Sequence, residues 1–323
     1  MTLFNMFKYI KFDQFNNQLE IINLWNKEFY KIYPISEELF IRNSLNLEKN
    51  ISYVALNDNN DLVGFVLVKI WKEEFQITSY DDFCWINLIY VDPKSRRLGI
   101  GSKLLELVEK EAKKIGKKNL FLGKDYYNYF PGLPVDLKNS CTWFEKRGFV
   151  RPYDTYDLIK NIDNPTLDKL KLRNDSFVYR TSTLDDKENL IDFMKKNWPG
   201  RWLKELIDYY DNGGDGKEYV IALDKDVICA FAKLGYPQSK ISLVSYSMTW
   251  KNRFEALGGI GPLGVDISYR KRNLGYDIVA FANNILIDCN VSNIIIDWTG
   301  LLDFYRRMGF EVFKSYYYMN KTL

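Results

Sequence analysis

The sequence contains the same arginine- and glycine-rich loop twice, and this duplication constrains the fold more than any other feature. The first copy is residues 91–102, VDPKSRRLGIGS. The second copy begins at Val265, and in both copies the first arginine, Arg96 or Arg270, lies five residues after the valine. A single loop of this kind would be a weak signal, since solvated turns before helices are common. The repeat indicates two related modules.

Each copy of the loop stands between a predicted strand and a predicted helix. Residues 85–91 form an apolar run, and after the loop apolar residues recur at helical spacing until Gly116, which favours a helix C-cap. The loop leaves the N–H groups of a helix N-terminus free, and Gly99 places no Cβ in front of them. Asn273 stands at the position of Gly99 in the second copy and tolerates a left-handed backbone. Both loops therefore predict a site for a phosphate or pyrophosphate.

The remaining pattern predicts an α/β fold of two tandem modules, residues 1–162 and 163–323. In each module we expect a mixed, mostly antiparallel sheet flanked by helices. Apolar runs on both sides of the turn-forming residues 57–61 and 224–226 predict two hairpins. Further strands are expected at residues 7–12, 119–122, 149–159, 177–180, 260–265, 294–297 and 311–319, and further helices at residues 19–30, 36–41 and 183–197.

The composition excludes several classes of function. The 323 residues include no histidine, which rules out Ser-His-Asp and Cys-His catalysis and histidine metal sites. The net charge is only +3 and the basic residues are dispersed, which argues against nucleic acid as the main partner. No apolar run could span a membrane and no signal peptide opens the sequence, so we expect a cytoplasmic protein. Its dispersed cysteines are expected to be reduced, buried thiols: Cys84, Cys141, Cys229 and Cys289.

A second motif also occurs once in each module. Residues 143–149 (WFEKRGF) and 304–310 (FYRRMGF) both place an aromatic pair ahead of Gly-Phe. Together with the Arg-x-x-Gly-x-Gly loop after a Val-Asp-Pro strand end, this motif resembles the GNAT superfamily of N-acetyltransferases. The resemblance covers nearly the whole chain as two tandem modules. Residues 129–134, 198–202 and 297–299 resemble a subgroup of tandem bacterial GNAT proteins that is similar to clostridial glucosamine/glucosaminide N-acetyltransferases.

The resemblance implies acetyl-CoA as the cofactor and no metal. In GNAT proteins the loop holds the pyrophosphate, basic side chains neutralise phosphates, and the preceding strand pairs with the pantetheine arm. One N–H group where the strands separate would polarise the acetyl carbonyl. The residues at these positions are Ile89, Tyr90, Val91, Arg96, Arg97, Leu98, Gly99, Ile100, Gly101 and Ser102 in the first module, and Leu263, Gly264, Val265, Arg270, Lys271, Arg272, Asn273, Leu274, Gly275 and Tyr276 in the second.

Tyr305 and Asp297 are the candidate catalytic residues. By the resemblance, a tyrosine on the helix after the fifth strand protonates the departing thiolate, and a phenol suits this task because it stays protonated near neutral pH. Asp297 ends a predicted strand and could accept the amine proton or pair with a cationic amine. A core aromatic and a salt-bridged or capping carboxylate are the alternatives. The first module has Phe144 at the tyrosine position and Asp125 as a weaker counterpart of Asp297.

We therefore expect an acyltransferase that moves acetyl from acetyl-CoA to a primary amine of a small molecule, directly in a ternary complex. Glucosamine or a glucosaminide is the preferred acceptor, and the aromatic segment 123–141 with Trp198, Trp202 and Trp250 suits a sugar site or packing equally well. An aminoglycoside, a polyamine, an amino acid or a protein amine remains an alternative acceptor. A non-catalytic acyl-CoA-binding module is the alternative from another class, and Phe144 makes the first module its better candidate. The sequence does not predict the oligomeric state.

Overall fold

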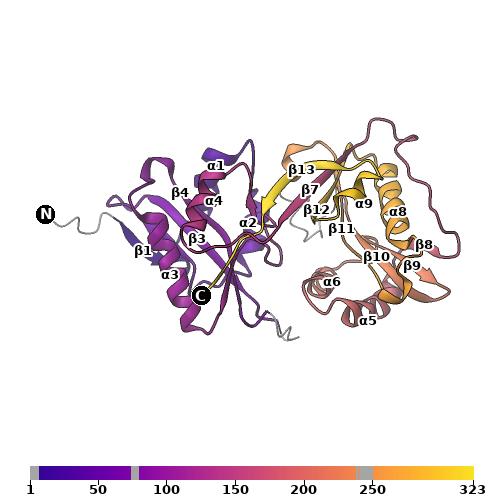
Figure 1. The fold of residues 1–323 in the computed structure, drawn as a ribbon, viewed down its shortest axis with the longest axis horizontal. Helices are drawn as coiled ribbons and strands as arrows, with labels where there is room; N and C mark the ends of the chain where they lie inside the picture. Colours follow the sequence, from indigo (N-terminus) through magenta and orange to yellow (C-terminus); the bar gives the residue numbers. More distant parts are fainter. Residues whose placement is uncertain (1–6, 74–79, 238, 240–249) are drawn as a thin grey trace. The chain divides into compact units, whose positions relative to one another are not determined.

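The computed structural model describes residues 7–73, 80–237, 239 and 250–323 (Figure 1). The chain divides into two compact units. Unit 1 contains residues 1–155 and 315–323, and unit 2 contains residues 156–314. Each unit has a mostly antiparallel sheet with helices packed on it, which confirms the predicted fold class. Within the described ranges, no helix is both long enough and apolar enough to cross a membrane.

Unit 1 contains the elements β1 (Lys8–Lys11), η1 (Phe12–Gln14), α1 (Leu19–Phe29), α2 (Glu37–Ser44), β2 (Tyr53–Leu56), β3 (Leu62–Ile70), β4 (Phe83–Val91), η2 (Pro93–Ser95), α3 (Ile100–Lys114), β5 (Asn119–Leu122), β6 (Leu133–Pro134), α4 (Lys138–Glu145) and β14 (Asn320–Thr322). Its sheet has six strands in the order β1-β2-β3-β4-β5-β14. β4 and β5 run parallel because α3 crosses over between them, whereas the other neighbours run antiparallel.

The side chains of β3 alternate between the two faces of this sheet. Val66 and Val68 point to one face, where they join the hydrophobic core formed with α3. Phe65 points to the other face, where its ring centroid lies 5.9 Å from that of Tyr90. The Tyr90 ring in turn lies 5.7 Å from Trp25 of α1. Helices α1 and α3 therefore cover opposite faces of the sheet.

Unit 2 repeats this plan. Its elements are β7 (Asp154–Asn161), β8 (Val178–Thr181), η3 (Leu184–Asp186), α5 (Lys187–Asn197), α6 (Arg201–Asp211), β9 (Tyr219–Asp224), β10 (Val227–Gly235), η4 (Lys251–Arg253), β11 (Leu257–Val265), η5 (Ile267–Tyr269), α8 (Leu274–Asp288), β12 (Asn293–Thr299), α9 (Leu302–Arg306) and β13 (Glu311–Tyr317). The second sheet has eight strands in the order β6-β13-β7-β12-β11-β10-β9-β8, in which β6 pairs with residues 316–317 of β13 and β11 runs parallel to β12. Ala230 and Ala232 of β10 lie in the core with α8. Phe231 faces the opposite side, where it contacts Trp198 and Phe193 of α5.

The division between the units differs from the expected boundary after residue 162. The prediction gave the strand at residues 149–159 to the first module, but residues 156–161 of β7 pair with β12 in unit 2. The last residues of the chain belong to unit 1, where β14 pairs with β5. Both pairings join segments that are far apart in the sequence, so the local periodicity of the sequence does not predict them.

Most predicted elements are present, and the missed ones are short or lack a clear start signal. The strand expected at residues 119–122 has those bounds as β5. The two-residue β6 and three-residue β14 are too short to produce a pattern. Helix α6 follows Pro199 and Gly200, and its N-cap makes no side-chain hydrogen bond.

Candidate functional site

The first loop has two left-handed residues just before α3. Asp92 follows β4, and its side chain accepts a hydrogen bond from Lys94 N at 2.8 Å. Arg97 and Gly99 have φ angles of 65° and 88°, and α3 begins at Ile100. A Cβ on Gly99 would meet no heavy atom within 4 Å. The first N–H groups of α3 are therefore approachable by an anion.

The second loop has the same geometry before α8. The Asp266 side chain accepts a hydrogen bond from Ser268 N at 2.9 Å. Lys271 and Asn273 have φ angles of 65° and 64°. Asn273 is the N-cap residue of α8 in the left-handed conformation, as expected for the residue that replaces Gly99. Both loops thus end in the same backbone arrangement.

Arg96 is already paired, which differs from its predicted role at a phosphate. Its Nε donates to the carbonyl of Val91 at 2.9 Å, and its guanidinium forms an ion pair with Glu28 of α1. Glu28 also accepts a hydrogen bond from the Tyr90 hydroxyl at 2.8 Å. Arg96 therefore fastens the loop to α1. The exposed basic side chains that remain for phosphates are Arg97, Arg270, Lys271 and Arg272.

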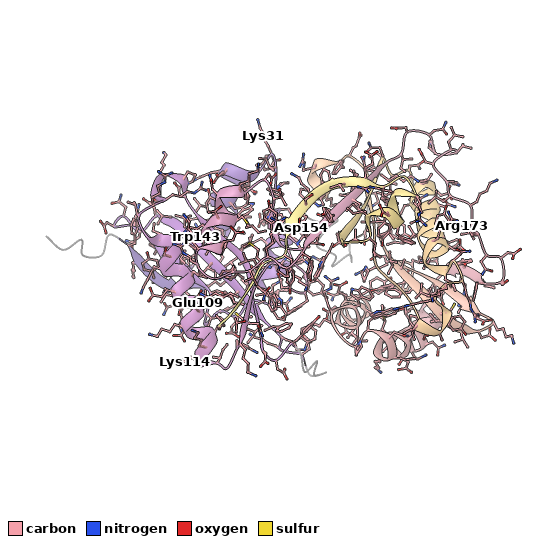
Figure 2. All side chains as sticks on the ribbon, viewed as in Figure 1. Lys31, Glu109, Lys114, Trp143, Asp154 and Arg173 are labelled. Atoms are coloured by element: carbon pink, nitrogen blue, oxygen red, sulfur yellow. The ribbon has the colours of Figure 1, made fainter. Side chains whose placement is uncertain are left out.

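Of the other predicted loop residues, some are buried in the core and some are exposed. Ile100 and Leu274 are buried at the starts of α3 and α8. The Ser102 hydroxyl accepts a hydrogen bond from Arg147 Nη2 at 2.7 Å, and the guanidinium of Arg147 stacks on Trp143 of α4, labelled in Figure 2. Leu98 is exposed. Gly101 faces the Trp143 ring, and Gly275 faces Phe304. Tyr276 stacks with Arg173.

The parallel strand pairs separate before their C-terminal ends. The described pairing of β4 with β5 ends at Ile86 and Leu122, and that of β11 with β12 ends at Gly259 and Ile295. Residues 89–91 and 263–265, predicted to pair with pantetheine, lie beyond these points and pair on their other edge with β3 and β10. This separation leaves one edge of each central strand available to a ligand among the pairings described.

The structure brings Tyr305 and Asp297 together in unit 2. Tyr305 of α9 is buried, and its ring lies 4.9 Å from Phe304. Its hydroxyl shares a hydrogen bond with the Thr299 side chain. Burial raises the pKa of Tyr305, and the charge of Asp297 raises it further. The phenol is thus protonated and lies within the electrostatic field of the carboxylate.

Asp297 lies in an acidic environment that the sequence did not reveal. Burial raises the pKa of its carboxyl to about 8, and the nearby carboxylate of Asp157 raises it further. Arg201 of α6 opposes this shift, while Glu205 adds to it. Asp297 is half-buried, so it also contacts solvent. A carboxyl with this pKa can hold or release a proton near neutral pH.

Asp157 and Glu205 both have polar partners in unit 2. Asp157 of β7 accepts hydrogen bonds from Trp298 N at 3.1 Å and from Trp250 Nε1 at 3.3 Å. Arg201 Nε lies 3.5 Å from Glu205 Oε1, and its guanidinium stacks on the Trp298 ring at 4.0 Å. The strand at 154–161 has the sequence DTYDLIKN and contains several other polar residues, so no local signal in the sequence singles out Asp157.

The register of the strands corrects the predicted match between Asp125 and Asp297. Asn119 and Asn293 begin the equivalent strands β5 and β12, where they pair with the first residues of β4 and β11. Asp297 lies four residues after Asn293, and Gly123 lies four residues after Asn119. Unit 1 therefore has a glycine at the position of Asp297.

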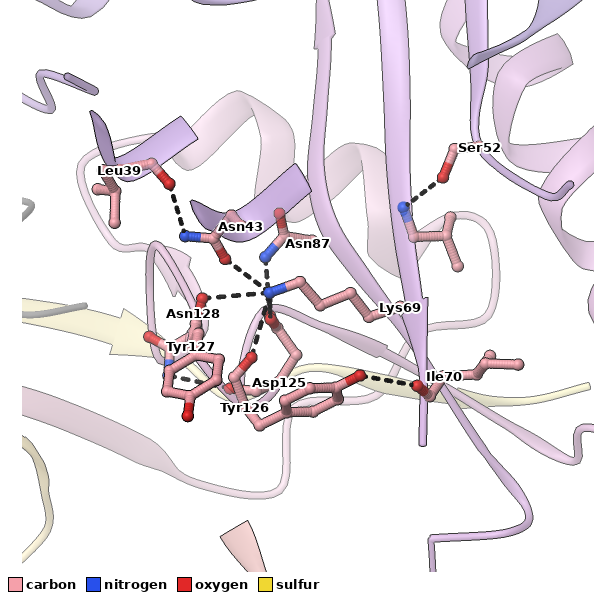
Figure 3. Close-up of polar contacts among 11 residues, drawn as sticks. Leu39, Asn43, Ser52, Lys69, Ile70, Asn87, Asp125, Tyr126, Tyr127 and Asn128 are labelled. Atoms are coloured by element: carbon pink, nitrogen blue, oxygen red, sulfur yellow. Dashed lines mark hydrogen bonds and ion pairs between the residues drawn. The ribbon is translucent and has the colours of Figure 1, made fainter. Parts of the chain in front are cut away.

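Asp125 instead forms a buried ion pair with Lys69 of β3, drawn in Figure 3. Lys69 Nζ lies 2.7 Å from Asp125 Oδ2 and 2.6 Å from Asn43 Oδ1, and it also donates to the carbonyls of the two residues after Asp125. Asn87 Nδ2 donates to both carboxylate oxygens of Asp125, at 3.1 and 3.0 Å. Lys69, Asn43, Asn87 and Asp125 are all buried. The carboxylate is occupied by partners of the same unit.

The described residues contain no group of three or more cysteine or acidic side chains placed to hold a metal ion. Asp92 and Asp266, which begin the two loops, are used for backbone capping instead.

Comparison with known proteins gives a family match for part of unit 1 and establishes the fold of the chain. Residues 19–130 match the acetyltransferase (GNAT) family model. A tandem GNAT protein from the clavulanic acid biosynthesis pathway superposes with a TM-score of 0.65 at 13% identity, covering 98% of each chain. A GCN5-related N-acetyltransferase from Sphaerobacter thermophilus gives a TM-score of 0.69 at 14% identity, covering 99% of this chain and 97% of that one. The chain therefore has a tandem GNAT fold, and within unit 1 residues 19–130 match the GNAT family model.

One similar structure has a more specific description. It contains the GCN5-related glucosamine N-acetyltransferase region of a fungal multi-domain GH3 β-N-acetylglucosaminidase, with a TM-score of 0.83 and 22% identity. The match covers 97% of this chain but only 38% of that protein. No curated protein sequence matches the chain. At this level of identity the likeness establishes the fold.

Proposed function

We propose that this protein is an acetyl-CoA-dependent N-acetyltransferase in which unit 2 transfers acetyl to a primary amine. The observation that carries the proposal is the grouping of Tyr305, Thr299 and Asp297 at the end of β12, next to the strand that leads into the second loop. This group combines a protonated phenol with a carboxyl that can exchange a proton near neutral pH. Those are the two proton-transfer functions that amide formation from an amine and a thioester needs.

The residues present in both loops fit coenzyme A. The left-handed N-cap residues Gly99 and Asn273 leave the helix N-termini approachable, and the open edges of β4 and β11 suit an extended pantetheine arm. When bound, acetyl-CoA would supply the acetyl thioester. Arg97 in unit 1 and the exposed basic residues of residues 270–272 in unit 2 would neutralise its phosphates.

In the proposed reaction Asp297 accepts the proton of the attacking amine. Tyr305 donates its hydroxyl proton to the departing thiolate sulfur, and its bond to Thr299 orients that hydroxyl. A backbone N–H where β11 leaves β12 polarises the acetyl carbonyl. Direct transfer in a ternary complex is favoured over an acetyl-cysteine because burial raises the pKa of Cys84 to about 12 and that of Cys229 to about 11.

A small amino sugar, glucosamine or a glucosaminide, is the proposed acceptor. The described likeness to a glucosamine N-acetyltransferase region supports this choice, as does the acidic environment of Asp297, which suits a cationic amine. The tryptophans do not add support, since Trp198 packs on Phe231 and Trp250 is buried. Aminoglycosides, polyamines, amino acids and protein amines are the competing acceptors.

Unit 1 is proposed to bind coenzyme A without transferring acetyl. It keeps the complete glycine loop, but Phe144 replaces the tyrosine and Gly123 replaces Asp297. Its nearby carboxylate, Asp125, is neutralised by Lys69. In this role unit 1 is a non-catalytic acyl-CoA-binding module.

A turnover screen tests the proposal. Release of free thiol from acetyl-CoA is measured with amino sugars, aminoglycosides, polyamines and peptides, and product acetylation is confirmed by mass. We expect turnover with amino sugars, and we expect it to survive Gly99→Glu in unit 1 better than Asp297→Asn in unit 2. Turnover confined to peptides would refute the acceptor class, and the reverse order of the two variants would refute the assignment to unit 2.

A further inference from the structure

A fully buried lysine in unit 2 has an amine without a hydrogen-bond partner. Lys233 lies in β10 with no exposed surface, and its Nζ makes no hydrogen bond in the described structure. Burying an amine without a hydrogen-bond partner costs free energy, so such a group calls for an explanation, and a bound ligand that supplies the missing partner is one. Lys69 on the equivalent strand of unit 1 shows the contrast, because it has a carboxylate and several oxygen partners.

Other unpaired polar atoms lie around the Lys233 amine. The Oε2 atom of Glu218 is buried and has no partner in the described structure, while its Oε1 bonds to Ser239. The hydroxyl of Tyr219 is likewise buried without a partner there, and Lys233 Nζ lies 5.8 Å from the centre of the Tyr219 ring. Glu218 and Lys233 interact electrostatically. Lys233 lies opposite Tyr219 in the pairing of β10 with β9, and Glu218 is the residue before Tyr219. A buried donor and a buried acceptor without partners therefore lie on neighbouring parts of the sheet.

Helix α6 links this cluster to the surroundings of Asp297. The Arg201 guanidinium stacks 4.0 Å from the ring of Trp298, the residue after Asp297, and Arg201 Nε lies 3.5 Å from Glu205 Oε1. Arg201 and Glu205 of α6 act electrostatically on Asp297, and the same two residues act on Lys233. The charged groups that act on Lys233 are the carboxylates of Glu205, Glu218 and Asp208 and the like charge of Arg201. Helix α6 therefore carries residues that interact both with Asp297 and with Lys233 of β10.

We infer that Lys233 Nζ and Glu218 Oε2 bind a hydroxyl group of the amine acceptor. A hydroxyl can accept from the amine and donate to the carboxylate at once, so it completes both groups without adding charge. A carboxylate on the acceptor would face Glu205 and Glu218, and a second ammonium would face Lys233 and Arg201. The inference rests on the proposed function of unit 2 and selects a hydroxylated amine over amino acids and polyamines.

The test compares glucosamine with cyclohexylamine, a ring amine without hydroxyl groups. For Lys233→Met and for Glu218→Gln we expect the KM for glucosamine to rise roughly ten- to hundredfold with kcat little changed, since a bond made in both ground and transition states is lost. The kcat/KM for cyclohexylamine should change less than about threefold, because that acceptor does not use the bond. The matched control is Lys195→Met, an exposed lysine on α5. Equal losses for both amines, or no loss for glucosamine, would overturn the inference.

Stability gives a readout that is independent of turnover. Lys233→Met should fold with an unchanged or higher melting temperature, because it removes an unpaired buried amine. Lys69→Met should melt several degrees lower, because it leaves Asp125 unpaired. A lower melting temperature for Lys233→Met would mean that the amine is satisfied within the protein, and this would overturn the inference.

Calorimetric titration with glucosamine in the absence of acetyl-CoA separates the two proposals. Wild-type protein that binds glucosamine but acetylates no amine refutes the proposed function, and weaker binding by Lys233→Met then still supports the hydroxyl site. Wild-type protein that acetylates amines while Lys233→Met binds glucosamine normally refutes the hydroxyl site alone.

Discussion

At the scale of single residues, Tyr305 illustrates how packing prepares a proton donor. Its ring contacts Phe304 and Phe310, and its hydroxyl bonds to Thr299. These contacts therefore fix the direction in which the hydroxyl points. Phe144 at the equivalent place in unit 1 has similar aromatic neighbours but no hydroxyl.

Tyr305→Phe should keep the packing and lose the proton donor. We expect kcat to fall roughly 10²–10⁴-fold, the usual contribution of a positioned acid. The KM for acetyl-CoA should change little, since the contact strengthens only in the transition state. Steady-state kinetics with the best acceptor measures both constants, and a thioester with a more acidic leaving thiol should narrow the gap. A near-normal kcat would make Tyr305 a core aromatic only.

Asp297 should control the pH dependence of turnover. The burial-raised pKa of about 8 keeps the carboxyl largely protonated at neutral pH, so its basic form increases as the pH rises through this value. We expect kcat/KM to rise with pH up to an apparent pKa near 8 in the wild type. In Asp297→Asn the rate should fall and this limb should disappear.

The matched control is Asp125→Asn in unit 1. It should preserve the pH profile while destabilising the fold, because it removes the charge that pairs with the buried Lys69. Thermal melting measures the stability and pH-rate profiles measure the activity. A lost alkaline limb in Asp125→Asn, with a normal one in Asp297→Asn, would reverse the assignment of the two units.

At the scale of elements, each loop consists of a short helical turn and two left-handed residues, and a helix follows it. Its geometry comes from local choices: an aspartate that caps the turn, and glycine or asparagine at the N-cap. Arg96 joins the first loop to α1 through Glu28. The loop is therefore set before any ligand arrives.

Gly99→Glu should abolish binding of coenzyme A to unit 1. The new side chain would enter the space in front of α3 and would place a negative charge near the pyrophosphate. Calorimetry should then lose one class of acetyl-CoA sites. Gly99→Ala is the control, since it adds the strain of a Cβ at a φ of 88° without the charge. Unchanged stoichiometry in Gly99→Glu would show that unit 1 does not bind the coenzyme.

At the scale of the whole molecule, each unit is completed by a segment from the other half of the sequence. Residues 156–161 of β7 pair with β12 in unit 2, and β14 pairs with β5 in unit 1. Met319, just before β14, is fully buried in the core of unit 1. Unit 1 thus depends on the last residues of the chain.

Removal of residues 318–323 should selectively destabilise unit 1. Loss of the buried Met319 alone should cost about 2–5 kcal/mol, and the backbone bonds of β5 to β14 are lost in addition. Hydrogen exchange should accelerate in β5 but not in α8. Thr322→Ala keeps the backbone pairing and should exchange like the wild type. Slow exchange in β5 after the truncation would show that β14 is dispensable.

The sequence alone determined the features that arise within short segments. The two loops, the hairpins, β5 and the left-handed Asn273 follow from residue preferences and periodicity, which act over a few neighbouring positions. The Tyr305 candidate came from the resemblance to a family, and the Asp297 candidate came from its position at the end of a predicted strand.

Only the tertiary structure decided which distant side chains meet. It paired Lys69 with Asp125, placed Asp157 and Glu205 near Asp297, left Lys233 unpaired, and assigned β14 to unit 1. Buried charge and strand partnership depend on which segments pack together. That choice is made by the burial of the whole core and by hydrogen bonding between strands remote in the chain, and neither produces a local signal in the sequence.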